Sequence, residues 1–214
     1  MRRPRSKIGL ESAPRGQRPR RMSPAARLEV LTEAALQVFA RDGLGAARHA
    51  RVAETAGVAL ATVFHYFPTR TALVDSVLAE VDRRYISGLV RAAAEQDAPA
   101  PEAILNLLMS FADSIDEAPE HALIWLEWST AVRAEVWSAY LAFHQRATAG
   151  IAAIVQGGIE RDEVKASLDP MDVAHIVVGL AHPIAHMKFS GSSRETIEHA
   201  MNALVGQYLR PAAA

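Results

Sequence analysis

The chain has 214 residues, of which half are hydrophobic and none is cysteine. This composition supplies enough apolar side chains for a substantial core and excludes disulfides and thiolate zinc sites. Apolar stretches fall far short of the ~20 residues that a membrane helix needs, and the Arg-rich N-terminus has no hydrophobic stretch typical of a secretory signal. We therefore expect a cytoplasmic protein without membrane contact, built as a small domain joined to a larger one.

The net charge of -1 conceals an unequal distribution of charge along the chain. Residues 1–70 carry 13 Lys and Arg against 5 Asp and Glu, a net of +8, whereas residues 71–214 carry 10 against 19, a net of -9. A basic N-terminal part attracts polyanions, which is typical of a nucleic-acid binder. The alternative is a basic tail that is merely solvated.

Residues 1–22 contain eight basic residues and three prolines without a hydrophobic period, which predicts a disordered basic arm. A first helix is predicted from Ser23 and Pro24, because serine caps helices and proline suits the first helical position. Gly43 and Gly45 are expected to end that helix.

The next segment has the pattern of a helix-turn-helix at about 48–67, within a unit covering residues 23–70. A short helix over 48–56, a turn at Gly57 and a second helix from 59, stopped by Pro68, make the second helix a candidate for the major groove. A generic helical hairpin is the alternative. Thr62 and His65 lie three residues apart and so share a helix face from which they can reach phosphates or base edges. Tyr66 is predicted to contact phosphate, whereas Val63, Phe64 and Phe67 are assigned to the core.

The remaining residues, 71–214, show helical periodicity throughout, and no strand pattern or repeat occurs. Thr69 is predicted to cap a long helix reaching Ala94, in which apolar residues recur every four positions at Leu73, Val77, Val81, Tyr85 and Leu89. Further helices are expected around 104–118, 121–132, 134–160, 169–189 and 193–209. Ser192 with Glu195 is predicted to form a capping box for the last helix. The sequence thus predicts an all-α protein of about nine helices.

The stretch VAETAGVALATVFHYFPTRTAL, Val52–Leu73, resembles the DNA-binding signature of the TetR family of regulators. The stretches RPRRMSP at Arg18–Pro24 and WLEWSTAVRAEVW at Trp125–Trp137 are similar to the quorum-sensing master regulators of the LuxR, HapR and SmcR type. The resemblance implies an N-terminal three-helix DNA-binding domain and a C-terminal helical domain for ligand binding and dimerisation. His65 stands where that subgroup usually has Asn, and Ala59 and Leu60 replace Ser and Val.

The resemblance also implies roles for basic residues. Arg18, Arg20 and Arg21 resemble the subgroup's arginine-bearing extension, which enters the minor groove; non-specific phosphate attraction is the alternative. Arg70, just past the second helix, is predicted to contact phosphate, and Arg48 and Arg51 are predicted to add charge, with a solvated face as the alternative. We therefore expect the partner to be double-stranded DNA with a pseudo-palindromic operator, bound at the nucleoid by a homodimer.

In the C-terminal part, Trp125 and Glu127 match positions that line a ligand cavity in the subgroup, although a purely structural Trp is the alternative. Phe111, Trp137, Leu141 and His144 are further candidates by helical phase. Such a cavity would take a small apolar ligand.

His175, His182 and His186 are separated by nearly whole helical turns and fall on one face. A metal-dependent enzyme using this cluster with Glu127 is an alternative, but the sequence supplies no nucleophile, phosphate loop or paired carboxylates, so we expect neither a metal site nor a cofactor. An architectural DNA binder is the other alternative. Dimerisation is predicted through the last two helices, whose apolar stripes are Ile176, Leu180 and Ile184, and Ile197, Met201, Leu204 and Tyr208.

Overall fold

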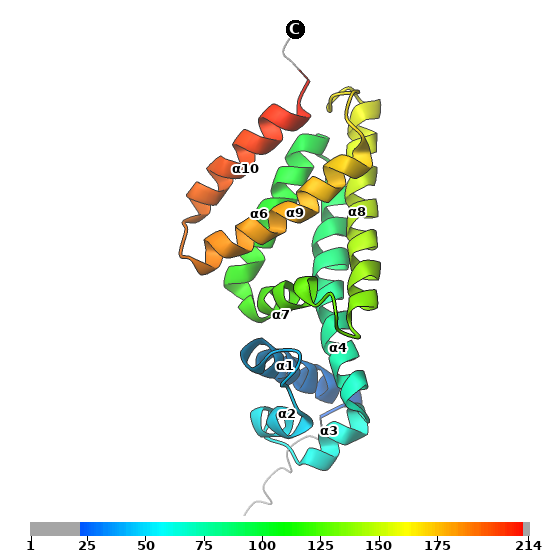
Figure 1. Cartoon of the computed structure of the whole chain (residues 1–214), viewed down its shortest axis with the longest axis vertical. Coiled ribbons are helices and arrows are strands. Elements are labelled where there is room, and N and C mark those ends of the chain that lie inside the picture. The colour runs from blue at the N-terminus through cyan, green and yellow to red at the C-terminus, as the bar shows by residue number, and fades with distance from the viewer. Residues whose placement is uncertain (1–21, 212–214) are drawn as a thin grey trace, which may run out of the picture.

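The computed structural model describes residues 22–211, and helices are the only regular secondary structure over that range, as predicted. Three helices, α1 (Pro24–Asp42), α2 (His49–Ala56) and α3 (Leu60–Tyr66), form a small unit, called the head below, at the lower end of the molecule in Figure 1. The larger body lies above it. The predicted arm over residues 1–22 falls, except for Met22, outside the described residues.

The head is held together by the inner face of α1. Leu31, Val38 and Phe39 are almost completely buried and belong to the same core as Val52 of α2 and Val63 of α3. The start of α1 is as predicted, because Ser23 Oγ accepts a hydrogen bond from the backbone N–H of Ala26 at 3.2 Å. This side chain satisfies one of the free N–H groups of the first turn.

One continuous helical segment connects the head with the body. It consists of α4 (Arg70–Asp82), the π-helical η1 (Arg83–Val90) and α5 (Arg91–Ala94). Thr69 Oγ1 accepts from the N–H of Ala72, which confirms the predicted cap. The long helix ends at Ala94 as expected, but its π-helical middle was not predicted.

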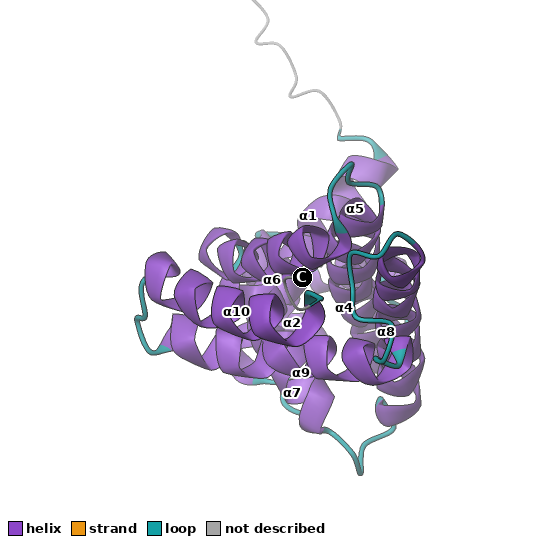
Figure 2. Cartoon of the chain, turned by 90° about the horizontal axis from the view of Figure 1, so that it is seen from above, coloured by secondary structure: helices purple, strands orange, loops and turns teal. Residues whose placement is uncertain are grey.

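The body contains α6 (Ala100–Glu117), α7 (Pro119–Thr130), α8 (Trp137–Glu160), α9 (Pro170–Phe189) and α10 (Arg194–Leu209). Helix α6 is central and contacts α8, α9 and α10, while α7 crosses at the bottom of the body and packs on α1 of the head (Figures 1 and 2). With α4, η1 and α5 taken as one, residues 22–211 form nine continuous helices. None of these helices is long and apolar enough to cross a membrane.

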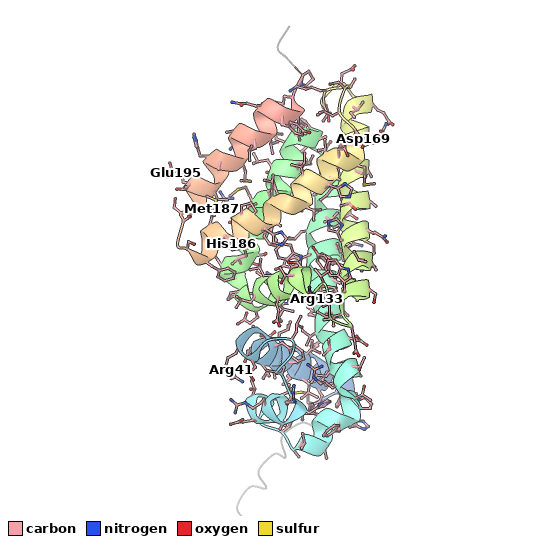
Figure 3. All side chains as sticks on the ribbon, viewed as in Figure 1. Arg41, Arg133, Asp169, His186, Met187 and Glu195 are labelled. Carbon is pink, nitrogen blue, oxygen red and sulfur yellow. The ribbon has the colours of Figure 1, made fainter. Side chains whose placement is uncertain are left out.

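The caps of the last two helices test the predicted boundaries. Asp169, labelled at the start of α9 in Figure 3, accepts hydrogen bonds from the N–H groups of Met171 and Asp172 through Oδ1, at 2.8 and 3.0 Å. The predicted capping box at Ser192 was wrong by one residue, since Ser193 caps α10 by accepting from Thr196 N–H.

Candidate DNA interface and ligand cavity

The turn between α2 and α3 depends on Gly57, whose backbone is left-handed at φ 63° and ψ 37°. A side chain there is unfavourable because of the contact between Cβ and the carbonyl oxygen. The N–H groups of Gly57 and Val58 donate to carbonyls of α2, at 3.2 and 3.0 Å, and so close the helix end. This geometry turns the chain between the two helices, so that α3 packs on α2.

Helix α3 presents four side chains to solvent, from Leu60, Ala61, Phe64 and His65. Their positions i, i+1, i+4 and i+5 form one continuous face. Val63 and Phe67 are buried as predicted, with exposures of 0% and 3%. The predicted contact residues Thr62 and Tyr66 are half-buried at the edges of this face, so both can still touch a duplex laid on it.

Phe64 was wrongly assigned to the core, because its side chain is 45% exposed. Its ring stacks on that of His49 with centroids 4.4 Å apart and planes 9° from parallel. The His49 ring is fixed in turn, since Nε2 donates to the carbonyl of Phe67 at 2.8 Å. The spacing of Val63 and Phe67 could have revealed this arrangement, because a residue beside a buried i, i+4 pair points about 100° away from it.

The predicted basic residues of the head bind the head's own backbone or carboxylates. Arg48 Nη1 donates to the carbonyls of Gly45 and Ala47. Arg51 pairs with Glu54 at 2.8 Å and lies 3.9 Å from Asp42. Contact of these two arginines with DNA stays a prediction. Arg18, Arg20 and Arg21 lie outside the described residues.

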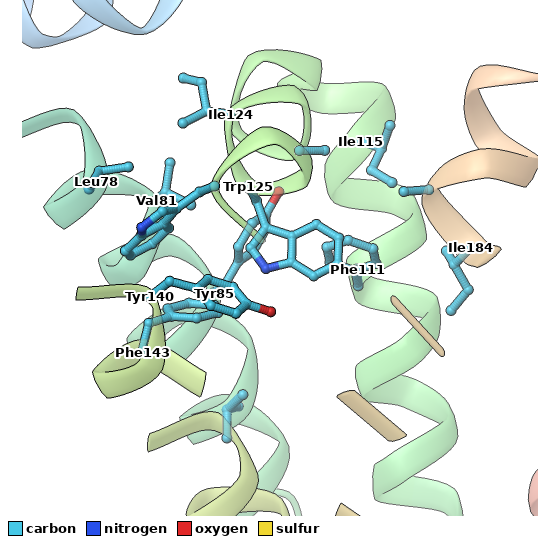
Figure 4. Close-up of a cluster of buried hydrophobic side chains, with 14 of the residues drawn as sticks. Leu78, Val81, Tyr85, Phe111, Ile115, Ile124, Trp125, Tyr140, Phe143 and Ile184 are labelled. Carbon is cyan, nitrogen blue, oxygen red and sulfur yellow. The ribbon is translucent and has the colours of Figure 1, made fainter. Parts of the chain in front are cut away.

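A cavity of about 70 Å³ lies in the body, and its walls are almost entirely apolar. Figure 4 shows the converging aromatic side chains, including Tyr85, Phe111, Trp125 and Phe143. The ring centroids of Phe111 and Trp125 are 5.6 Å apart and those of Tyr85 and Phe111 5.3 Å. The walls come from η1, α6, α7, α8 and α9: Tyr85, Ile86, Leu89, Val90, Leu107, Leu108, Phe111, Trp125, Phe143, Ala147, Ile151, Val177, Val178 and Ala181.

Two of the six predicted ligand residues, Phe111 and Trp125, are therefore on the cavity wall, and four are not. Leu141 is 45% exposed. Trp137 stacks on Tyr140 at the start of α8, and the His144 ring stacks on His175 at 5.8 Å. These three do not line this cavity, because the phase of α8 is set by packing on α9, which helical spacing alone does not give. Their contact with a ligand stays a prediction. The four η1 residues of the wall were missed.

Glu127 is the fourth predicted ligand residue that is not on the cavity wall, and it faces away from the cavity and towards the head. Its two carboxylate oxygens accept from the backbone N–H of Leu44 at 3.0 and 2.9 Å. Two residues along a helix correspond to a rotation of about 200°, so Trp125 and Glu127 project from opposite sides of α7. Arg70 donates to the carbonyl of the same Leu44, and to that of Gly45 at 3.1 Å.

The histidine cluster is not assembled with Glu127. His182 is hydrogen-bonded to Ser129 Oγ at 2.9 Å, and its ring centroid lies 4.4 Å from that of Trp125, with the two planes inclined by 48°. Among residues 22–211, no group of His, Cys, Asp and Glu is placed to hold a metal ion. The enzyme alternative therefore loses the residue arrangement on which it depended.

Comparison with known proteins agrees with both parts of this architecture. Residues 31–77, which span most of the head and the start of α4, match the family described as bacterial regulatory proteins, tetR family. The HTH-type transcriptional regulator LuxR of Vibrio harveyi is 36% identical over 193 residues, covering 90% of this chain and 92% of that protein. The chain belongs to the tetR family of bacterial regulatory proteins. It is a helix-turn-helix transcriptional regulator of the LuxR and HapR subgroup.

Solved structures of other transcriptional regulators share this fold at low sequence identity. FadR from Bacillus subtilis, in complex with stearoyl-CoA, superimposes with a TM-score of 0.72 at 19% identity, covering 83% of this chain and 97% of that one. The ketosteroid transcriptional regulator KstR2 of Mycobacterium tuberculosis gives a TM-score of 0.68 at 18% identity, covering 89% and 97%. These likenesses establish that the head-and-body fold extends over nearly the whole chain.

Proposed function

We propose that this regulator binds a pseudo-palindromic operator as a homodimer, with one α3 helix of each protomer in successive major grooves. The observation that carries the proposal is the exposed face of α3, where Leu60, Ala61, Phe64 and His65 project beside the half-buried Thr62 and Tyr66. A methyl group or aromatic edge can contact thymine methyls, and an imidazole can donate to or accept from base edges. In this proposal residues 23–70 bind DNA, and residues 71–214 serve dimerisation and regulation.

Basic side chains around α3 supply phosphate contacts in this proposal. Arg48, Arg51 and Arg70 contact phosphates, and the arm residues Arg18, Arg20 and Arg21 enter an adjacent minor groove, as their resemblance to the subgroup suggests. Removing residues 1–21 should lower the dependence of log K on log salt by roughly 0.9 for each phosphate that the arm neutralises. An unchanged slope would exclude the arm contacts. Binding DNA in this way places the protein in the cytoplasm, at the nucleoid.

The surface proposed for dimerisation lies on α9 and α10. Ile176, Leu204 and Tyr208 are between 41% and 49% exposed and border an apolar groove of about 160 Å³ between the two helices. Three members of the predicted stripes, Ile184, Ile197 and Met201, are instead at most 3% exposed and serve the protomer's own core. Exposed apolar groups of this extent are typical of a surface that another chain covers.

The cavity supports control of DNA binding by a compact, uncharged apolar molecule. Its walls have almost no polar surface, so a charged ligand would lose its hydration without compensation. It is smaller than the ~150 Å³ cavity that accepts benzene, so a ligand must displace wall side chains. Displacement of this kind lets a ligand favour one arrangement of the body over another. The similarity to LuxR supports a regulator of the quorum-sensing type.

The test is the ratio of specific to non-specific DNA affinity at one fixed salt concentration. Genomic fragments enriched by the dimer should bind at least ~10³-fold more tightly than shuffled fragments of the same composition. A ratio near one would overturn the proposal and favour an architectural DNA binder, which contacts phosphates without reading sequence.

A further inference from the structure

We propose that Glu127 is a positioning residue that fixes the head on the body, and that it carries the state of the cavity to the helix-turn-helix. The inference rests on the proposed ligand control and assigns a residue pathway to it. Both carboxylate oxygens of Glu127 are within hydrogen-bond distance of a single backbone N–H, that of Leu44. A carboxylate is a stronger acceptor for a backbone N–H than a neutral group is.

The Leu44 peptide is held from both sides by side chains from other helices. Glu127 of α7 accepts from its N–H, and Arg70 at the start of α4 donates to its carbonyl. Leu44 itself is 7% exposed and belongs to the core. We call Glu127 and Arg70, with the Leu44 peptide between them, the interdomain clamp. It grips the loop that leads directly into α2, so its position sets the orientation of the helix-turn-helix.

The conformation of Gly43 allows the carboxylate to approach. Its φ is 83°, in the region that favours glycine, and a Cβ built there would lie 3.3 Å from Glu127 Oε2. Such a methyl group would crowd the carboxylate as well as strain the backbone. Glycine at position 43 therefore leaves room for the Glu127 carboxylate of the body.

Helix α7 links the cavity to the clamp by a single rigid element. Trp125 lies on the cavity wall, and Glu127 projects from the opposite side of the same helix. Because α7 also packs on α1 of the head, a small rotation of α7 changes the cavity wall and the clamp together. A ligand that displaces Trp125 therefore moves the loop before α2 without contacting DNA.

The first experiment measures operator affinity with dimeric full-length protein. Glu127→Ala should weaken binding on the order of tenfold, the effect expected for removal of a charged hydrogen bond. Glu127→Gln keeps an acceptor oxygen and should stay within a few-fold of the parent. Glu102→Gln, on α6, is the control, because Glu102 is exposed and has no hydrogen bond or ion pair to residues 22–211. Helix content and dimerisation should be unchanged in all three. Equal losses of operator affinity in Glu127→Ala and Glu127→Gln, or no loss in Glu127→Ala, would overturn the proposal.

The second experiment separates positioning from simple stabilisation. Ala147→Val adds volume to the cavity wall and, under the proposed ligand control, changes operator affinity. In a double-mutant cycle, that change should disappear in the Glu127→Ala background, because the two sites are coupled through α7. An equal effect in both backgrounds would contradict the clamp as the route. If Ala147→Val does not change operator affinity in the parent protein, the proposed ligand control is wrong, and so is its transmission through Glu127. The first experiment still decides whether Glu127 fixes the head on the body.

Discussion

Phe64 places an aromatic ring on the surface of α3, next to His65, in a position where burial gives no reason for its presence. Stacking on His49 holds this ring in a defined orientation. A rigid apolar ring on the exposed face of α3 can make apolar contacts with thymine methyl groups, which present carbon rather than hydrogen-bonding atoms in the major groove. We therefore expect Phe64, as well as His65, to contribute to sequence discrimination.

Phe64→Ala should weaken binding to the selected operator by roughly tenfold, which corresponds to one good base interaction of ~1–3 kcal/mol. Affinity for shuffled DNA should fall much less, because phosphate contacts are retained. Titration with both DNAs measures the difference. Leu123→Ala is the control, since Leu123 is similarly exposed, at 40%, but lies on α7. If the ratio of operator affinity to shuffled-DNA affinity in Phe64→Ala equals that of the parent protein, the ring does not contact bases.

His121 lies at the joint between head and body, where neither ring nitrogen has a hydrogen-bond partner among the described residues and Nε2 lies 3.9 Å from Glu80 Oε1. Burial, and then the nearby Arg84, lower the pKa of this imidazole, with Glu80, Glu33 and Glu120 acting in the opposite direction. The folded protein therefore disfavours protonation at His121. In the unfolded chain, by contrast, a histidine protonates near pH 6.5.

Because the unfolded state binds this proton first, the free energy of unfolding should fall as pH drops below about 6.5, by at most ~1.4 kcal/mol per pH unit from this group. Urea unfolding between pH 7.5 and 5 measures the slope. His121→Leu should make it shallower, although burial also lowers the pKa of His144 and His182, so some slope remains. His199→Leu, exposed on α10, is the control. An unchanged slope in His121→Leu would contradict this account.

At the scale of elements, the connecting helix between head and body combines α-helical ends with a π-helical middle. Its buried side chains recur every four residues from Leu73 to Tyr85, a longer repeat than the 3.6 residues of an α-helix. Because an α-helix has 3.6 residues per turn, side chains spaced four residues apart shift gradually around its surface. The wider turns of a π-helix bring the later side chains back towards the body. Arg83–Val90 thus directs Tyr85 to the cavity, and π-helical turns are frequent at functional sites.

Two glycines should respond in opposite ways to the same substitution. Gly88 is exposed in η1 at ordinary helical φ, with room for a methyl group, so Gly88→Ala should stabilise the protein by about 0.5–1 kcal/mol. Gly57 has φ of 63°, so Gly57→Ala should destabilise it by about 1–2 kcal/mol. Denaturant unfolding compares the two. Changes of the same sign would show that backbone conformation does not determine these effects.

Local features were the most predictable from sequence. The caps Ser23, Thr69 and Asp169 act within three residues, so their hydrogen bonds follow from the adjacent sequence. The cavity depended on how helices face one another, which periodicity does not specify. Trp125 was placed correctly through family resemblance, but Glu127 was placed on the wrong side of its helix.

For the whole molecule, the proposed operator binding depends on two heads held at a fixed separation by dimerisation. The exposed apolar side chains of α9 and α10 are the proposed contact between protomers, at the end of the body remote from α3 (Figure 1). Two linked heads gain affinity from binding together, by a factor of ~10²–10⁴ over one head alone.

Leu204→Glu should therefore abolish dimerisation and lower operator affinity by at least ~10²-fold, although Leu204 does not contact DNA. Sedimentation and DNA titration measure the two effects on one preparation. Val132→Glu, 58% exposed in the loop after α7, should leave both unchanged. A Leu204→Glu protein that remains dimeric would locate the interface elsewhere.

The central claim is that the exposed face of α3 reads DNA sequence, and binding-site selection tests it most directly. Selection from random DNA with the parent protein should return a pseudo-palindrome whose half-sites lie about 10 base pairs apart, one helical turn. His65→Asn replaces an imidazole with an amide, which favours adenine, and should change the same position in both half-sites. Identical motifs from the two proteins, or no motif from the parent, would contradict the claim.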